Sequence, residues 1–123
     1  MSIDFTDSEL TTIQNAVDNR WRKEKVAVNL ADIEITKEEE KEPKLYPAAV
    51  WEDANSTFII LKMGNFSYKS FFYYLTDKRF DTGVPEYNDL HECTDKLLKA
   101  QADFILTKNT KGLNVHIHKG SGI

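Results

Sequence analysis

The sequence predicts an α+β fold in which a mainly antiparallel sheet of about five strands carries two packed helices. Three observations lead to this prediction. The most apolar stretch, residues 57–75, has the pattern of two strands, amphipathic segments with helical spacing lie before and after it, and shorter alternating segments flank it. The expected order is helix, four strands, helix, strand (α-β-β-β-β-α-β). A length of 123 residues indicates a single domain, 1–123.

The first expected helix covers about residues 7–23. Thr6 can cap it, and Glu9 follows Thr6 at the spacing of a capping box. Apolar residues then recur every three or four positions and form one stripe along the helix: Leu10, Ile13, Val17 and Trp21. Basic residues close the segment, where positive charge complements the helix dipole.

Residues 26–36 alternate between apolar and polar side chains, but the alternation changes phase. Val28 falls in the even register, whereas Ile33 falls in the odd one. Because a slip of one residue moves every side chain to the other face, we expect a β-bulge or a bend near residues 31–32.

Two short segments follow before the apolar centre of the chain. Residues 37–44, KEEEKEPK, are predicted to form an exposed charged loop. Residues 45–52 have the composition of a strand, and Pro47 places this strand at an edge of the sheet or the proline at its start, since proline cannot donate to a β-ladder.

The central segment, residues 57–75, is predicted to be a β-hairpin. Its first half is apolar without alternation, as in a strand buried on both faces, and Gly64-Asn65 suits a two-residue turn. On the return, alternation predicts two groups on opposite faces: Phe66, Tyr68, Phe72 and Tyr74 on one, and Phe71, Tyr73 and Leu75 on the other. A helix over residues 67–76 is the alternative. A membrane span is disfavoured, because Lys62 and Lys69 interrupt the apolar run.

The last third of the chain is predicted to hold a loop over 76–85, a helix over about 86–106 and a final strand over 113–117. The helix has a buried stripe that consists of Leu90, Cys93, Leu97, Ala100 and Phe104. The strand is predicted from the alternation of apolar residues with Asn114, His116 and His118. Residues 119–123 are expected to be a flexible tail.

Composition narrows the functional classes. A net charge of −4 argues against non-specific nucleic-acid binding, which needs basic residues to neutralise phosphates. The single cysteine, Cys93, cannot form an internal disulfide, and the N-terminus lacks the pattern of a signal peptide. These features together predict a protein of the reducing cytoplasm, with no membrane partner.

Two groups of residues are candidates for chemistry, and both have a simpler structural interpretation. His116 and His118 would share one strand face and could ligate a metal, but a site needs further ligands, so an exposed strand face is favoured. His91 and Cys93 could pair as base and nucleophile, but residues two apart on a helix do not face each other. The sequence therefore predicts no catalytic residue, no metal and no cofactor.

Aromatic residues make up 11% of the chain, which is generous for a two-layer fold. If helices cover only the opposite face of the hairpin, aromatic side chains are exposed, and exposed rings with a charged rim are typical of protein interfaces. The expected partner-binding residues are Tyr68, Phe72, Tyr74 and Trp51, with the acidic residues Glu38, Glu39, Glu40 and Glu42.

The leading functional hypothesis is a non-enzymatic module with an inhibitor, immunity-type or adaptor role. Its expected partner is another protein, with a basic protein favoured by the acidic charge, and a homodimer is the second option. The alternative hypothesis is a small ligand-binding or metal-assisted enzyme domain with a pocket between the central hairpin and the second helix.

Overall fold

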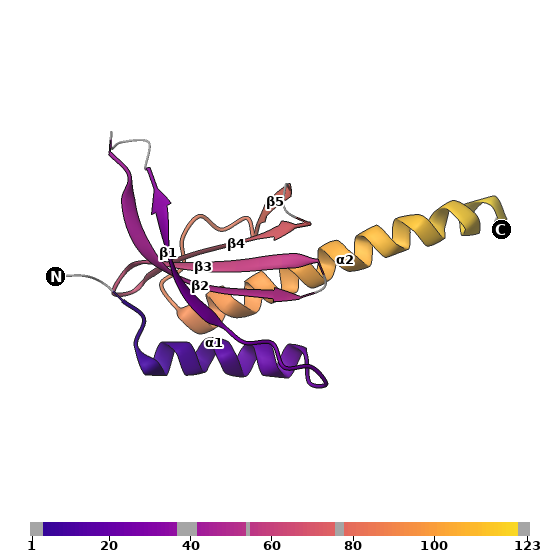
Figure 1. The fold of residues 1–123 in the computed structure, drawn as a ribbon. Helices are drawn as coiled ribbons and strands as arrows, with labels where there is room; N and C mark the ends of the chain where they lie inside the picture. The colour runs from indigo at the N-terminus through magenta and orange to yellow at the C-terminus, as the bar shows by residue number, and fades with distance from the viewer. Residues whose placement is uncertain (1–3, 37–41, 54, 76–77, 121–123) are drawn as a thin grey trace.

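A computed structural model of the chain describes residues 4–36, 42–53, 55–75 and 78–120, with the backbone alone for 109–120. One helix, α1 (Asp7–Arg20), precedes five strands, and a second helix, α2 (Leu90–Gly120), follows them. The strands are β1 (Asn29–Ile35), β2 (Lys44–Asp53), β3 (Ser56–Gly64), β4 (Ser67–Tyr74) and β5 (Lys78–Asp81). They form one antiparallel sheet in the order β1-β2-β3-β4-β5, as Figure 1 shows. The predicted α+β fold is confirmed.

The position of the fifth strand differs from the prediction. Residues 113–117 continue α2, which runs past the end of the sheet (Figure 1), and the fifth strand is β5, within the segment predicted to be a loop. A strand needs a neighbour for its backbone hydrogen bonds, whereas a helix satisfies its own. β5 has that neighbour because it follows β4 directly and pairs with Phe71–Tyr74. Residues 119 and 120 of the predicted flexible tail end α2, and residues 121–123 lie outside the described part.

The capping box predicted for α1 is present. The Thr6 hydroxyl accepts a hydrogen bond from the Glu9 backbone N–H (3.1 Å), and the Glu9 carboxylate accepts one from the Thr6 backbone N–H (2.8 Å). The predicted stripe faces inward, with Ile13 and Val17 fully buried. The helix ends at Arg20, three residues before the predicted end.

The β-bulge predicted near residues 31–32 is wrong. β1 pairs with β2 without interruption from Asn29–Val50 to Ile35–Lys44. The change of phase needs no extra residue, because the two apolar sets face opposite sides: Val28, which precedes the strand, packs against the helix-side core, whereas Ile33 packs in the cluster on the opposite face. A register shift occurs instead in the β3–β4 hairpin.

Pro47 occupies a local edge inside β2. β2 lies between β1 and β3, but its pairing with β3 begins only at Ala48, so the proline pairs with β1 alone. A missing N–H costs little where no second neighbour is present to accept it. The edge predicted from Pro47 is therefore confined to one end of this strand.

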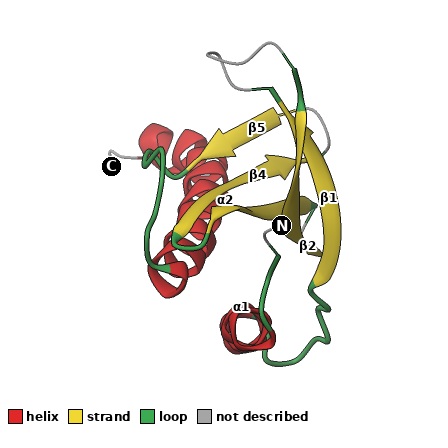
Figure 2. Cartoon of the chain, turned by 90° about the vertical axis from the view of Figure 1, so that its left-hand side faces the viewer, coloured by secondary structure: helices red, strands yellow, loops and turns green. Residues whose placement is uncertain are grey.

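Both helices pack on one face of the sheet (Figure 2). The apolar core on this face combines residues from both helices and four strands, with Ile13 and Val17 from α1 and Cys93 and Leu97 from α2. A second, smaller cluster on the opposite face contains strand residues only. Among the described residues, no helix is both long and apolar enough to cross a membrane.

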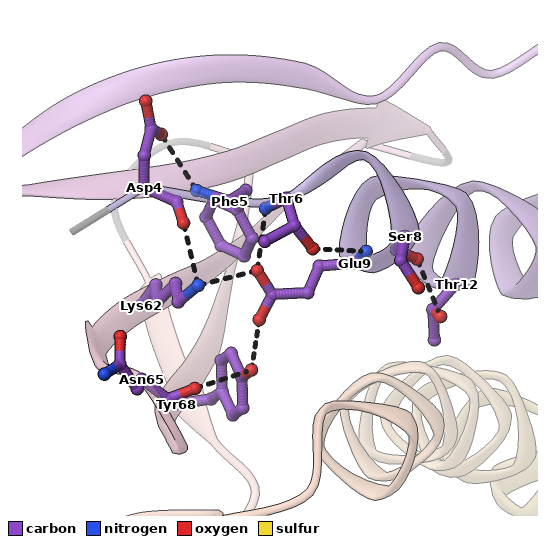
Figure 3. A network of polar contacts seen from close by, with 9 residues as sticks. All are labelled: Asp4, Phe5, Thr6, Ser8, Glu9, Thr12, Lys62, Asn65 and Tyr68. Carbon is purple, nitrogen blue, oxygen red and sulfur yellow. Dashed lines mark hydrogen bonds and ion pairs between the residues drawn. The ribbon is translucent and has the colours of Figure 1, made fainter.

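A partly buried polar network attaches the start of α1 to the hairpin (Figure 3). Lys62, on β3 and only 4% exposed, donates to Glu9 and to the Asp4 carbonyl oxygen, both at 2.7 Å. The other Glu9 oxygen accepts a hydrogen bond from the Tyr68 hydroxyl. Burial raises the pKa of Glu9, but its contacts with Lys62 and Tyr68 outweigh this effect, so the pKa lies below its ordinary value.

A second polar connection holds the other end of α1. The Arg20 guanidinium donates to the Leu98 carbonyl oxygen (2.8 Å) and to the Gln101 side chain on α2. Gln101, which is fully buried, donates in turn to the Ser56 hydroxyl at the start of β3 (3.1 Å). α1 is thus joined to the sheet at its start, and at its end it is joined to α2 and, through Gln101, to the sheet.

Candidate functional site

Two of the aromatic residues predicted to bind a partner, Trp51 and Phe72, lie at the centre of the core. Trp51, Phe58, Phe72 and Phe80 are neighbours across four strands, and their rings contact one another at centroid distances of 5.2–6.1 Å. Phe104 of α2 packs against Phe72 and Phe80, and Trp21 packs against Phe58. Trp51 and Phe72 are each only 1% exposed. The prediction that they are exposed is wrong.

The remaining predicted binding residues have different environments. Tyr68 is 4% exposed, and its hydroxyl donates a hydrogen bond to the Glu9 carboxylate, so its predicted exposure is also wrong. Tyr74 is half-buried against Phe104, and its hydroxyl accepts a hydrogen bond from Lys108 (2.7 Å). Glu42 is exposed, and the other three predicted acidic residues, Glu38, Glu39 and Glu40, lie outside the described part.

The uncovered face of the sheet is the candidate functional site, and we call it the open face. The register defines three rows of neighbouring residues on it: Ala31-Ala48-Leu61-Lys69, Asn29-Val50-Ile59-Phe71-Asp81 and Glu52-Thr57-Tyr73-Arg79. Leu61 and Phe71 are buried, whereas Val50 and Tyr73 are half-buried. Phe71 and Tyr73 meet edge to face at 5.8 Å. This face thus has an apolar floor that no helix of the described chain covers.

Part of the open face forms a groove with a volume of about 790 Å³. Its lining includes Ile35 from β1 and Arg79 from β5, which belong to the two opposite edges of the sheet. The sheet must curve for both edges to line one groove, as Figure 2 also shows. The floor consists of Leu61, Met63 and Phe71.

Charged groups of both signs surround this floor. The Arg79 guanidinium lies over the Phe71 ring, 4.0 Å from its centroid, and contacts Asp81 at 3.5 Å. Lys69 is half-buried in the groove, and no described residue forms an ion pair or hydrogen bond with its ammonium group. The groove also contains Glu34 and Glu86. The groove can therefore bind an apolar group and orient a charged one.

The candidate catalytic pair is not assembled. Cys93 is fully buried in the helix-side core, and burial raises the pKa of its thiol to about 11, so it is protonated at neutral pH. His91 is exposed and contacts Asp95 of its own helix at 3.1 Å. Cys93 therefore acts as a small core residue, as its place in the apolar stripe indicates.

His116 and His118 lie in α2 and not in a strand, so the predicted basis for a metal site is absent. On the observed helix, two residues separated by two positions are about 200° apart. Within the described ranges, no three metal-ligating side chains cluster. The pocket suggested between the hairpin and the second helix is occupied by core side chains, among them Phe72 and Leu97.

Comparisons of the chain with protein-family models, with curated proteins and with solved structures found no match. The function must therefore be argued from the open face itself. Its central residues, Phe71 and Tyr73, were visible in the sequence as one of the two alternating sets of β4. The alternation alone does not show which of the two faces the helices cover. It therefore could not identify Phe71 and Tyr73, and not the other set, as the residues of the uncovered face.

Proposed function

We propose that this chain is a non-enzymatic protein-binding module and that it binds its partner through the open face. The observation that supports the proposal is an apolar floor without helical cover, bordered by Val50 and Tyr73. Tyrosine is favoured at interfaces because it contributes a large apolar ring and a polar hydroxyl at little cost in conformational entropy.

A basic partner protein is favoured by the charge around this surface. Glu52 and Asp81 lie at the ends of the rows that contain Tyr73 and Phe71, and both are exposed. The net charge of the chain is −4, and Glu38, Glu39, Glu40 and Glu42 are among the acidic residues that give this charge. Complementary charge of this kind accelerates association and selects the partner. A homodimer through the same face is the second option.

The experiment first isolates partners by pull-down and then measures the dissociation constant for each with purified variants. We expect Tyr73→Ala to weaken binding by about tenfold or more, the scale of a central interface aromatic. The matched control is Leu106→Ala, which removes an exposed apolar side chain from α2, away from the open face. This control should leave the dissociation constant unchanged.

The same variants distinguish self-association from binding to another protein. If the chain is a homodimer through this face, light scattering should show that Tyr73→Ala is monomeric and Leu106→Ala is still dimeric. Replacing Glu38, Glu39, Glu40 and Glu42 with serine should weaken the binding of a basic partner, and the loss of affinity should be largest at low salt. Binding that withstands Tyr73→Ala and a Val50→Asp substitution alike would contradict the proposal.

A further inference from the structure

We propose that the groove in the open face binds a single aliphatic carboxylate, such as a fatty acid, with Lys69 as the main binding partner of the carboxylate. This inference goes beyond the proposed protein binding, and it concerns the groove half of the face. It combines three observations: two cations beside one buried ring, a half-buried lysine without a counter-ion among the described residues, and a groove whose volume and apolar lining suit a small ligand.

The first observation is the placement of the two cations around Phe71. Lys69 precedes Phe71 by two positions on β4 and therefore projects from the same face, one row away. Arg79 lies in the row on the other side, with its guanidinium over the Phe71 ring at 4.0 Å. Two positive groups thus flank one buried aromatic ring. An anion placed between them would gain from both charges.

The second observation is that Lys69 has no counter-ion among the described residues. Lys62, on the neighbouring strand and the opposite face, shows how the fold treats a buried cation, since it contacts both Glu9 and a carbonyl oxygen at 2.7 Å. Arg79 has Asp81 at 3.5 Å. Lys69 is half-buried on β4, at a position that pairs with β3 and lies before the pairing with β5 begins, yet its ammonium group is left to interact with water or a ligand. A ligand carboxylate would supply the missing partner.

The third observation is the shape and remaining charge of the groove. A volume of about 790 Å³ lies within the range of about 300–1,000 Å³ that is usual for small-molecule sites. Leu61, Met63 and Ile35 provide the apolar lining that an alkyl chain needs. Glu34 and Glu86 also line the groove and would repel a highly charged ligand such as a nucleotide. The site therefore fits a monoanion with a long apolar chain.

The test is a titration of the full chain with dodecanoate, in which binding is measured by calorimetry and by NMR of methyl-labelled methionine. We expect one dodecanoate per chain, a shift of the Met63 methyl signal, and binding at least tenfold weaker for dodecanol, which lacks the charge. The Met63 signal is assigned with a Met63→Leu variant, which is practical because the chain has only two methionines. Octanoate should bind at least tenfold more weakly than dodecanoate, because fewer methylene groups are buried.

Three substitutions locate the carboxylate. Lys69→Gln should weaken dodecanoate binding by about tenfold, the scale of a charge-assisted hydrogen bond. Arg79→Gln should weaken it by a smaller factor, and this exposed position keeps the test valid if Lys69→Gln fails to fold. Lys78→Gln is the matched control, since Lys78 is on the same strand as Arg79 but in the row of Tyr74, on the helix side. It should leave binding unchanged.

Three results would overturn the inference. They are equal affinity for dodecanoate and dodecanol, an unmoved Met63 signal at saturating dodecanoate, or equal losses in Lys69→Gln and Lys78→Gln. Binding of an apolar peptide through its free C-terminal carboxylate, without any binding of dodecanoate, would also overturn it in favour of a protein ligand. Failure here leaves the proposed protein binding standing, because that proposal depends on Tyr73 and Val50.

Discussion

Replacing Phe58 with alanine is expected to lower the free energy of unfolding by about 3–5 kcal/mol, the usual loss for a fully buried phenylalanine. Phe58 is 0% exposed and contacts three aromatic rings, those of Trp21, Trp51 and Phe72. Its removal would leave a cavity where α1 meets the sheet. Urea unfolding monitored by circular dichroism measures the change.

The matched control for this prediction is Phe66→Ala. Phe66 lies in the β3–β4 turn and is 78% exposed, so the same chemical change should alter the free energy of unfolding by no more than about 0.5 kcal/mol. A loss below about 1 kcal/mol for Phe58→Ala would contradict the packing described for the core, because the loss of a fully buried phenylalanine side chain lowers the free energy of unfolding by more than this.

Replacing Glu9 with glutamine is expected to cost on the order of 3 kcal/mol of unfolding free energy. Glutamine can keep the capping-box contact with Thr6, so the main loss is the negative charge beside Lys62. The Lys62 side chain is only 5% exposed, and without its partner it becomes a buried, uncompensated cation. Chemical denaturation of the variant and of the unmodified chain gives the difference.

Two comparisons show whether burial causes this loss. Asp103→Asn breaks the Lys99–Asp103 ion pair, whose side chains are 67% and 59% exposed, and should cost less than about 0.5 kcal/mol. The double change Glu9→Gln with Lys62→Met removes both charges and should recover most of the stability. If Glu9→Gln and Asp103→Asn cost the same, the buried network does not stabilise the fold as described.

Stability should fall in acid, in part because of Glu9. The pKa of Glu9 is lower in the folded chain than its ordinary value of 4.5, so the folded state holds the proton less tightly than the unfolded state does. Its contribution is therefore complete above about pH 4.5 and is lost as the pH falls through the folded pKa. The loss of stability between pH 5 and 2 should be smaller in Glu9→Gln. An identical pH dependence in the two proteins would rule out this role for Glu9.

The sequence predicted the elements whose signals are local. The stripes of α1 and α2, the capping box of Thr6 and Glu9, and the alternation of Phe71 and Tyr73 with their neighbours in β4 all depend on neighbours within a few positions, and the structure confirms them. Phe66 and Leu75, the outer members of the two predicted sets, lie in turns outside β4. Alternation at residues 113–117 misled because a strand needs a neighbouring strand for its backbone hydrogen bonds, whereas these residues continue α2, which satisfies its own. β5 was missed because four residues of mixed polarity carry almost no periodic signal.

The sequence alone thus determined which side chains share a face, and only the tertiary structure decided which face the helices cover. Trp51, Tyr68 and Phe72 were predicted to be exposed because alternation treats the two faces of a strand as equivalent. The helices break this equivalence, since Trp21 and Phe104 pack on one face and leave Phe71 and Tyr73 on the other. That choice depends on contacts between residues far apart in the chain, and it moves the candidate site to the opposite side of the sheet.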